Sequence, residues 1–390
     1  MQKESIPTKH GKIQLPAFMP DATYGAIKSI SFQDAKNAGV KEIVTTTLHI
    51  EQKIGSLFIK KIGGIHKFFG WDRPILTDSG GWQVFSLINS NKGAIKGNSI
   101  SELGCTFVDP DSGKHALLTA ESSQQIQHNL GGDIVTVLDN PILGNASFEE
   151  RKSSLAKNTK WAKRSLDKFK QLNDLDLNSP LPAIEMHKTE STSAQNRSLI
   201  GCVIQGGNDF ELRKISAEAL IDLDFDLYNF GGMPMHTEET WKTESKTGFY
   251  HEMLEYVSGL IPNNKYKYAM GVGKPDDIAF CVDVGWDLFD TVLPTRNARH
   301  GLLYVSEGQG EDTKGYKNLN YDVLHIKTEK YKYDTLPIDS NCNCEACKTI
   351  SRSYLRHLIR INEPSGFRLA TIHNLAFYAK WMDLIKTNLK

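Results

Sequence analysis

Short apolar runs alternate with segments of helical pattern along most of the chain. The runs cover residues 42–45, 74–77, 133–138, 199–204, 227–230, 268–272 and 288–292. Helical patterns are clearest over residues 149–172, 209–220 and 276–284, and the last begins with two aspartates, which suit a helix N-terminus. This alternation of short apolar strands with helices predicts an α/β fold built on a parallel sheet.

Polar or glycine-rich clusters follow several of the predicted strands. They are Asp78-Ser79-Gly80-Gly81, Asp139-Asn140-Pro141, Gln205-Gly206-Gly207, Gly231-Gly232 and Gly273-Lys274-Pro275. In a parallel barrel, the C-terminal ends of the strands carry the reactive groups. We therefore expect a functional site formed by these clusters. Two longer polar stretches interrupt the pattern: residues 173–198 are predicted to be an exposed insertion, and residues 236–248 a lid or a long loop.

Composition and charge narrow the function classes. Lysine plus arginine and aspartate plus glutamate both number 46, so the net charge is zero and any contact with nucleic acid must come from a local basic patch. The fractions of hydrophobic residues, 39%, and charged residues, 24%, are ordinary for a globular protein, and no apolar run approaches membrane-spanning length. The polar N-terminus predicts a cytoplasmic protein in a reducing compartment.

Three of the six cysteines form a metal-binding pattern. Cys342, Cys344 and Cys347 lie close together, and His373 follows them, which gives the three thiolates and one imidazole that tetrahedral zinc prefers. The pattern predicts a closed, structural Zn²⁺ site. The alternative is that His373 is a capping or core histidine. The remaining cysteines, Cys105, Cys202 and Cys281, are predicted to be buried core thiols.

Three aspartates lie at predicted strand ends. Asp78 is followed by two glycines that let a ligand approach the backbone, which is typical of an active site. Asp290 lies in an apolar run just before Arg296 and Arg299, so a buried acid paired with Arg296 is the structural alternative. Asp139 has an equally simple alternative as a helix cap or turn residue.

The segment Gly271-Val272-Gly273-Lys274-Pro275 looks like part of a phosphate-binding loop. It lacks the complete glycine-lysine-serine/threonine pattern, and a proline follows the lysine. ATP binding is therefore not expected. Lys274 is instead a candidate contact to a phosphate of a nucleic acid.

Taken together, the motifs resemble the tRNA-guanine transglycosylase family from about His10 to the C-terminus, in the order and spacing of the bacterial-type enzymes. The segments that carry the resemblance are Thr77-Asp78-Ser79-Gly80-Gly81-Trp82-Gln83-Val84-Phe85, Gly271-Val272-Gly273-Lys274-Pro275-Asp276, Phe289-Asp290-Thr291-Val292-Leu293-Pro294-Thr295-Arg296, and the cysteine set with Thr371-Ile372-His373-Asn374. The resemblance implies a (β/α)8 TIM barrel over residues 1–310, a zinc-binding subdomain over 311–373, and a C-terminal helix over 374–390 that closes the barrel.

The resemblance also implies a role for each site residue. Asp290 would be the nucleophile that attacks the ribose C1′ and Asp78 the general acid/base, because base displacement needs one ionised carboxylate at the sugar and one proton donor. Groups that contact the base would be Asp139, Gln205, the Gly232 backbone, Trp82, Met270 and Met233. Groups that hold the RNA beside the flipped nucleotide would be Lys274, Arg296 and Arg299. The implied substrates are tRNA and a 7-deazaguanine, and the implied assembly is a homodimer.

The sequence departs from the family pattern around the base pocket. Trp82 replaces the usual phenylalanine or tyrosine, Asp139-Asn140-Pro141 replaces Asp-Glu-Cys, and the loop after Gly232 reads Met233-Pro234-Met235-His236. A long Met235 side chain favours a small aminomethyl substituent on the incoming base over the cyclopentenediol of queuine. Two alternatives stay open: a relative that acts on DNA, and a non-catalytic partner subunit, against which the presence of both Asp78 and Asp290 argues.

Overall fold

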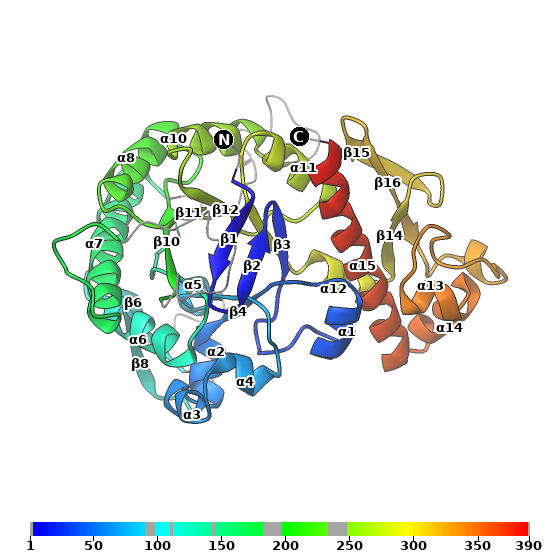
Figure 1. Cartoon of the computed structure of the whole chain (residues 1–390), viewed down its shortest axis with the longest axis horizontal. Coiled ribbons are helices and arrows are strands. Elements are labelled where there is room, and N and C mark those ends of the chain that lie inside the picture. The colour runs from blue at the N-terminus through cyan, green and yellow to red at the C-terminus, as the bar shows by residue number, and fades with distance from the viewer. Residues whose placement is uncertain are drawn as a thin grey trace.

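The computed structural model describes residues 3–89, 98–109, 112–141, 146–181, 197–232 and 248–388. Its central feature is an eight-stranded parallel sheet that curls into a barrel surrounded by helices (Figure 1). In hydrogen-bonded order the strands are β3 (Ala17–Pro20), β13 (Leu288–Thr291), β12 (Tyr266–Ala269), β11 (Leu227–Phe230), β10 (Leu199–Ile204), β9 (Ile134–Thr136), β5 (Ile75–Asp78) and β4 (Ile43–Thr46).

The two end strands of this order, β3 and β4, meet to close the barrel. A parallel bridge joins Asp21 to Val44, and the Ala22 N–H donates to the Val44 carbonyl over 2.8 Å. The expected (β/α)8 barrel is therefore confirmed. Asp21, which follows β3, takes part in the closure.

Helices surround the barrel and connect its strands. Those between the barrel strands are α1 (Phe32–Asn37), α2 (Thr47–Lys53), α3 (Ser56–Lys61), α4 (Ile65–Phe69), α5 (Gly81–Asn89), α6 (Ala120–Leu130), α7 (Phe148–Leu172), α8 (Phe210–Ile221), α10 (His251–Leu260) and α11 (Pro275–Asp283), with α12 (Leu293–His300) following β13. A small antiparallel sheet of β6 (Ser99–Ile100), β7 (Gly104–Val108) and β8 (His115–Thr119) lies between α5 and α6.

The barrel interior is apolar at its N-terminal end, where a hairpin covers it. The hairpin consists of β1 (Ser5–Thr8) and β2 (Gly11–Gln14) and lies in front of the barrel in Figure 1. Its Ile6 and Ile13 pack with Leu15 into one buried cluster with interior side chains of the barrel strands. The interior members of this cluster include Ala17, Met19, Val44, Leu76, Ile134, Leu199, Leu227, Tyr266, Tyr268 and Leu288. Because this end is filled and capped, the C-terminal strand ends are left to form a site.

Polar contacts of Asp133 link the hairpin to this end of the barrel. The Asp133 carboxylate accepts from the Ile75 N–H over 2.9 Å, and its two oxygens lie 2.9 Å from His10 Nδ1 and 3.0 Å from His66 Nε2. The two imidazole rings stack with centroids 3.4 Å apart and planes 16° from parallel. Rings stacked in this way cannot both direct a nitrogen in-plane at one shared ion, so the cluster is a structural connection rather than a metal site.

A second unit follows the barrel. An antiparallel sheet in the order β14 (Leu302–Ser306), β16 (Leu319–His325) and β15 (Asp312–Tyr316) leads through the 3₁₀ turn η1 (Glu329–Tyr331) to α13 (Glu345–Thr349) and α14 (Arg352–Arg360). The last helix, α15 (Pro364–Asn388), packs on both units and lies between them in Figure 1. The domain limits at 310 and 373 stay a prediction; 373 falls inside α15.

All seven strands and three helices predicted from hydrophobic periodicity are present. The strand expected at 268–272 is β12 (Tyr266–Ala269), which both begins and ends earlier. It cannot continue to residue 272 because Gly271 has a positive φ of 73°, which is not an extended conformation. The eighth barrel strand, β3 (Ala17–Pro20), and the small antiparallel sheets were not predicted. Of the expected polar insertion 173–198, residues 182–196 lie outside the described residues, as do residues 236–247 of the second polar stretch.

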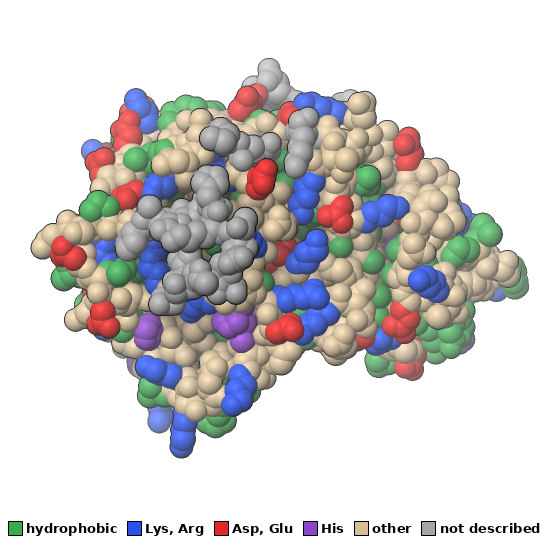
Figure 2. Space-filling model, viewed as in Figure 1, with side chains coloured by type: hydrophobic (Ala, Val, Ile, Leu, Met, Phe, Trp, Pro, Cys, Tyr) green, Lys and Arg blue, Asp and Glu red, His purple; other side chains and the backbone are tan. Residues whose placement is uncertain are grey.

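Two surface properties bear on function. On the face shown in Figure 2, basic and acidic side chains are interspersed, in keeping with the net charge of zero. Among the described residues, no helix is both long enough and apolar enough to cross a membrane.

Candidate active site and metal centre

The C-terminal ends of the barrel strands carry a group of mostly polar side chains, which we call the barrel mouth. Asp21, Thr46, Asp78, Met270 and Asp290 each lie two positions beyond an interior residue of the apolar cluster. Those interior residues are Met19, Val44, Leu76, Tyr268 and Leu288. Because side chains alternate along a strand, these five side chains face the barrel interior at its C-terminal end.

Asp78 is the last residue of β5 and is held on both carboxylate oxygens. Thr46 Oγ1 donates to Oδ2 over 2.6 Å, and the Gly80 N–H donates to Oδ1 over 2.9 Å. Gln83 Nε2 donates to the same Thr46 hydroxyl over 2.9 Å. Burial raises the pKa of Asp78 despite these hydrogen bonds, and the negative charge of Asp21 raises it further. A carboxyl group with a raised pKa keeps its proton to higher pH, which suits it to proton transfer.

Asp290 lies in β13, and its neighbours are neutral donors. The Gly271 N–H donates to Oδ1 over 2.8 Å, and the Tyr268 hydroxyl is a second hydrogen-bond partner. Burial, reinforced by the charges of Asp21 and Asp78, raises the pKa of Asp290 to about 6. Among the described residues Asp290 forms no ion pair with Arg296, so the alternative of a buried acid paired with that arginine is wrong. The Asp290 carboxylate is held in place without a permanent cation.

Asp139 and Gln205 form a pair on the opposite side of the mouth. Gln205 Nε2 donates to Asp139 Oδ2 over 2.7 Å, and burial raises the pKa of Asp139 to about 6. Glycines make room for this pair: a Cβ on Gly81 would lie 2.6 Å from the Asp139 carbonyl oxygen, and one on Gly231 would lie 2.4 Å from Gln205 Nε2. The acid and the amide together present hydrogen-bonding groups suited to the edge of a purine.

Arg213, a buried residue of α8, supports this side of the mouth. Its guanidinium donates to the carbonyls of Gly207 and Gly231 over 2.9 Å each and lies 4.1 Å from the centroid of the Phe230 ring. These contacts join the loops that follow β10 and β11. Arg213 therefore positions the segments that carry Gln205 and Gly232.

The remaining predicted site residues lie around the mouth. Met270 is half-buried beside the interior cluster, whereas Trp82 on α5 is 47% exposed. Lys274, immediately before α11, and Arg296 on α12 are exposed, and Arg299 is half-buried and donates to the Thr295 carbonyl over 2.8 Å. These predicted contacts to the base and the RNA stay predictions. Met233, together with Pro234 and Met235, lies outside the described residues.

Four residues at or behind the mouth were not identified from the sequence. They are Asp21, Thr46, Gln83 and Arg213. Recognition of β3 would have revealed Asp21, because the residue that follows Pro20 continues the alternation that begins at Ala17. No sequence signal distinguishes Arg213 from the other charged residues of an amphipathic helix.

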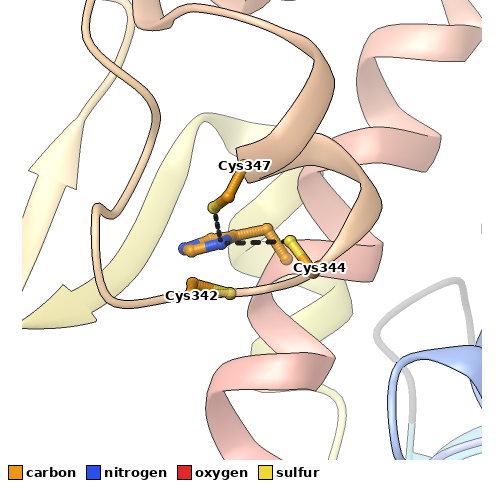
Figure 3. Close-up of side chains that lie close together, drawn as sticks. Cys342, Cys344 and Cys347 are labelled. Carbon is orange, nitrogen blue, oxygen red and sulfur yellow. Dashed lines mark hydrogen bonds between the residues drawn. The ribbon is translucent and has the colours of Figure 1, made fainter.

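The metal-binding residues come together in the second unit. The ligand atoms of Cys342, Cys344, Cys347 and His373 all lie within 4.8 Å of one another. His373 Nδ1 lies 3.2 Å from the sulfur of Cys347 and 3.8 Å from that of Cys344, and Figure 3 shows the three labelled cysteines around one imidazole ring. Cys342 and Cys344 precede α13 and Cys347 lies within it, while His373 is buried on α15, so the cluster joins two segments distant in sequence.

The imidazole tautomer fits a metal ligand. His373 Nε2 lies 2.8 Å from the Tyr304 carbonyl oxygen, which only accepts hydrogen bonds, so Nε2 carries the proton. Nδ1 then faces the three sulfurs, an arrangement in which a backbone carbonyl orients a metal-binding histidine. The alternative of His373 as an ordinary core histidine does not explain this convergence. The single cysteines, Cys105, Cys202 and Cys281, are buried as predicted.

The mouth divides into two halves according to strand order. One half lies at the ends of β5, β9, β10 and β11 and contains Asp78, Asp139, Gln205 and Gly232. The other half lies at the ends of β12, β13, β3 and β4 and contains Met270, Asp290, Asp21 and Thr46. The first half offers donors and acceptors for a planar base, and the second offers a carboxylate able to attack. Such a site is suited to displacement of a base from a sugar.

Comparisons with known proteins agree with this geometry. The family model for queuine tRNA-ribosyltransferase matches residues 4–390. A queuine tRNA-ribosyltransferase of Mannheimia succiniciproducens is 38% identical over 375 residues, which cover 96% of this chain and 86% of that protein. One from Actinobacillus pleuropneumoniae is 39% identical, covering 96% and 85% respectively, and one from Pasteurella multocida is 38% identical, covering 96% and 84%. The chain therefore belongs to the queuine tRNA-ribosyltransferase family, the tRNA-guanine transglycosylases that its motifs resemble.

Proposed function

We propose that this protein exchanges a guanine at the wobble position of tRNA for a 7-deazaguanine by double displacement. The observation that carries the proposal is the placement of Asp78 and Asp290 at the same barrel mouth, each desolvated and neither in an ion pair among the described residues. Two such carboxyl groups in different hydrogen-bonding environments are able to divide nucleophilic attack and proton transfer between them.

In the first displacement, an Asp290 oxygen forms a bond to the ribose C1′ while the bond from C1′ to the guanine nitrogen breaks. The electron pair of that bond leaves with the purine, and the proton of Asp78 neutralises it. In the second displacement, the incoming base attacks C1′, the ester to Asp290 breaks, and the proton of the incoming base passes to Asp78. Each aspartate thus returns to its starting state.

Asp139, Gln205 and the Gly232 backbone are proposed to hold the base, with Trp82 and Met270 on its two faces. The exposed Trp82 ring supports this role, because a site that must admit a flipped base needs an accessible stacking surface. Lys274, Arg296 and Arg299 are proposed to bind the flanking RNA. All three follow the strands of the half that holds Asp290.

The metal is proposed to be Zn²⁺ held by Cys342, Cys344, Cys347 and His373. The soft sulfur donors and the imidazole nitrogen Nδ1 directed at them support zinc over a hard cation. All four positions are protein ligands, so the ion would be structural, and the mouth residues alone would carry the chemistry. The metal would link the segment that contains the three cysteines, at α13, to helix α15.

The protein is proposed to act as a homodimer in the cytoplasm, where its tRNA substrate is modified. Two adjacent exposed apolar side chains support a protein interface: Leu57 and Phe58 on α3 are 74% and 52% exposed. Light scattering of the purified protein tests the assembly.

Incorporation of labelled guanine tests the function directly. The protein should exchange guanine into a tRNA anticodon stem-loop and not into DNA of the same sequence. Exchange into the DNA instead would favour the DNA-directed alternative. No exchange with either, unless a second chain is added, would favour the non-catalytic subunit.

The incoming base is proposed to carry a small aminomethyl group. Asn140, a proposed residue of the pocket wall, is buried, and its amide donates to Ser154 Oγ on α7 over 2.8 Å. This hydrogen bond holds the Asn140 side chain in place, so it would not move aside for a bulky substituent. Competition between 7-aminomethyl-7-deazaguanine and queuine for exchange measures the preference. A clear preference for queuine, the base in the names of the relatives, would reverse this assignment.

A further inference from the structure

A third acid, Asp21, lies between the two proposed catalytic aspartates. Strand order around this part of the barrel is β13, β3, β4 and β5, so the mouth residues follow one another as Asp290, Asp21, Thr46 and Asp78. In the β13–β3 register Asp290 pairs with Met19 and Thr291 pairs with Pro20, which puts Asp21 just above the nucleophile's level on the neighbouring strand. The influence of Asp21 on the pKa of both other acids agrees with this placement.

The Asp21 carboxylate forms no ion pair with a buried positive charge among the described residues. It accepts from the hydroxyl and the backbone N–H of Thr23, two positions away. Burial raises its pKa, while Lys28 and Arg299 oppose that rise from a distance. A desolvated carboxylate bound only by its own turn retains free acceptor capacity toward the mouth.

The positions of the mouth residues indicate which group of the bound nucleotide lies beside the Asp21 carboxylate. Asp139, Gln205 and Gly232 lie on the base side, whereas Asp21 is a neighbour of Asp290, the group proposed to bond to C1′. C2′ is bonded directly to C1′. Within a polynucleotide the 3′ and 5′ oxygens are esterified to phosphate, so the 2′-hydroxyl is the one free hydroxyl donor of the target sugar.

We propose that Asp21 accepts a hydrogen bond from the 2′-hydroxyl of the target nucleotide and thereby makes the exchange selective for RNA. This inference rests on the proposed transglycosylase function and deepens it, because it assigns the choice between ribose and deoxyribose to a single residue. A carboxylate facing a deoxyribose would lose this partner in a desolvated site, and such loss is costly.

Two stem-loops that differ in one oxygen test the inference. One carries a guanosine at the target position and the other a 2′-deoxyguanosine, with all other nucleotides ribose. The measured quantity is the ratio of kcat/KM for the two stem-loops, because this ratio cancels any general loss of activity in a variant. Thermal unfolding of each variant reports on its folding.

From wild type to Asp21→Ala, the preference for the ribose substrate should fall by about tenfold or more, the value of a hydrogen bond to a charged group. Asp21→Asn, which keeps an acceptor oxygen but no charge, should lose part of the preference and provides a second variant if the alanine protein is unstable. Asp167→Ala, which removes an exposed acid of α7, should keep the wild-type ratio.

A wild-type ratio in both Asp21→Ala and Asp21→Asn, even with lower activity on both substrates, would overturn the inference and leave Asp21 a structural or electrostatic neighbour. Absence of exchange by the wild-type protein on the all-ribose stem-loop would instead reject the proposed function. The two failures are therefore distinguishable.

Discussion

The barrel mouth and the cysteine cluster are built on opposite principles. The mouth collects acids from strands distant in sequence, and Asp78, Asp139 and Asp290 all have pKa values raised by burial. The cluster takes three ligands from six consecutive residues, Cys342–Cys347, and a fourth from α15. Desolvated acids lower the stability of a folded chain at neutral pH, whereas bound metal raises it. If the proposed roles are right, reactivity and metal-dependent stability are concentrated in separate units of this protein.

Removal of one metal ligand should have the largest effect on stability. Cys344→Ser should lose most of its zinc and several kcal/mol of unfolding free energy, because metal binding at a structural site contributes directly to folding. Metal analysis by mass spectrometry and denaturant unfolding measure the two effects. Cys202→Ser, which changes a buried cysteine outside the cluster, should retain its metal. Full zinc occupancy in Cys344→Ser would contradict the assignment.

Glu42 offers a smaller and pH-dependent test of the cost of a desolvated acid. This buried residue precedes β4 and has no hydrogen-bond or ion-pair partner among the described residues. Burial raises its pKa from the ordinary 4.5 to about 7. The folded state thus holds the Glu42 proton more tightly than the unfolded state does. The associated stability is present below pH 4.5 and is lost as the pH rises through about 7.

Glu42→Gln should therefore be more stable than wild type by about 3 kcal/mol near pH 8 and no more stable near pH 4. Denaturant unfolding at the two pH values measures the difference. Glu363→Gln, a change of an acid near the start of α15, should show no such gain. An equal effect of Glu42→Gln at both pH values would mean that packing, and not ionisation, is responsible.

The smallest predicted effect is a shift in the pH dependence of exchange. Asp290 must be ionised to attack C1′, and its pKa is raised to about 6, so kcat/KM should fall about tenfold per unit below that pH. Asp21→Asn removes a neighbouring negative charge that raises this pKa, so the acid limb should move to lower pH. An unchanged limb in this variant would show that Asp21 does not act electrostatically on Asp290.

The sequence predicted those parts of the molecule that depend on local pattern. Apolar runs located seven barrel strands, and the spacing of Cys342, Cys344 and Cys347 located the metal ligands, because both signals lie within a few residues. Asp78 and Asp290 were located by the motifs around them. The partner of Asp290 was not: its donors are the Gly271 N–H and Tyr268, on a neighbouring strand, rather than the nearby Arg296.

What could not be predicted depends on contacts between distant segments. β3 is only four residues long and entirely buried, so it lacks the alternation that identifies a strand, and Asp21 was missed with it. Arg213 contacts Gly231 and Gly207 only after α8 packs on the barrel. The tautomer of His373 depends on the Tyr304 carbonyl, far away in sequence.

The central claim, that Asp290 is the nucleophile, is tested most directly by isolating the covalent intermediate. Wild-type protein incubated with a guanine-containing anticodon stem-loop, with the incoming base withheld, should give an adduct stable to SDS whose RNA is attached to the peptide that contains Asp290. Asp290→Asn should bind the RNA and form no adduct, since its neutral amide cannot form the sugar ester, while Asp78→Asn retains the nucleophile. An adduct that persists in Asp290→Asn and disappears in Asp78→Asn would contradict the account and reverse the two roles.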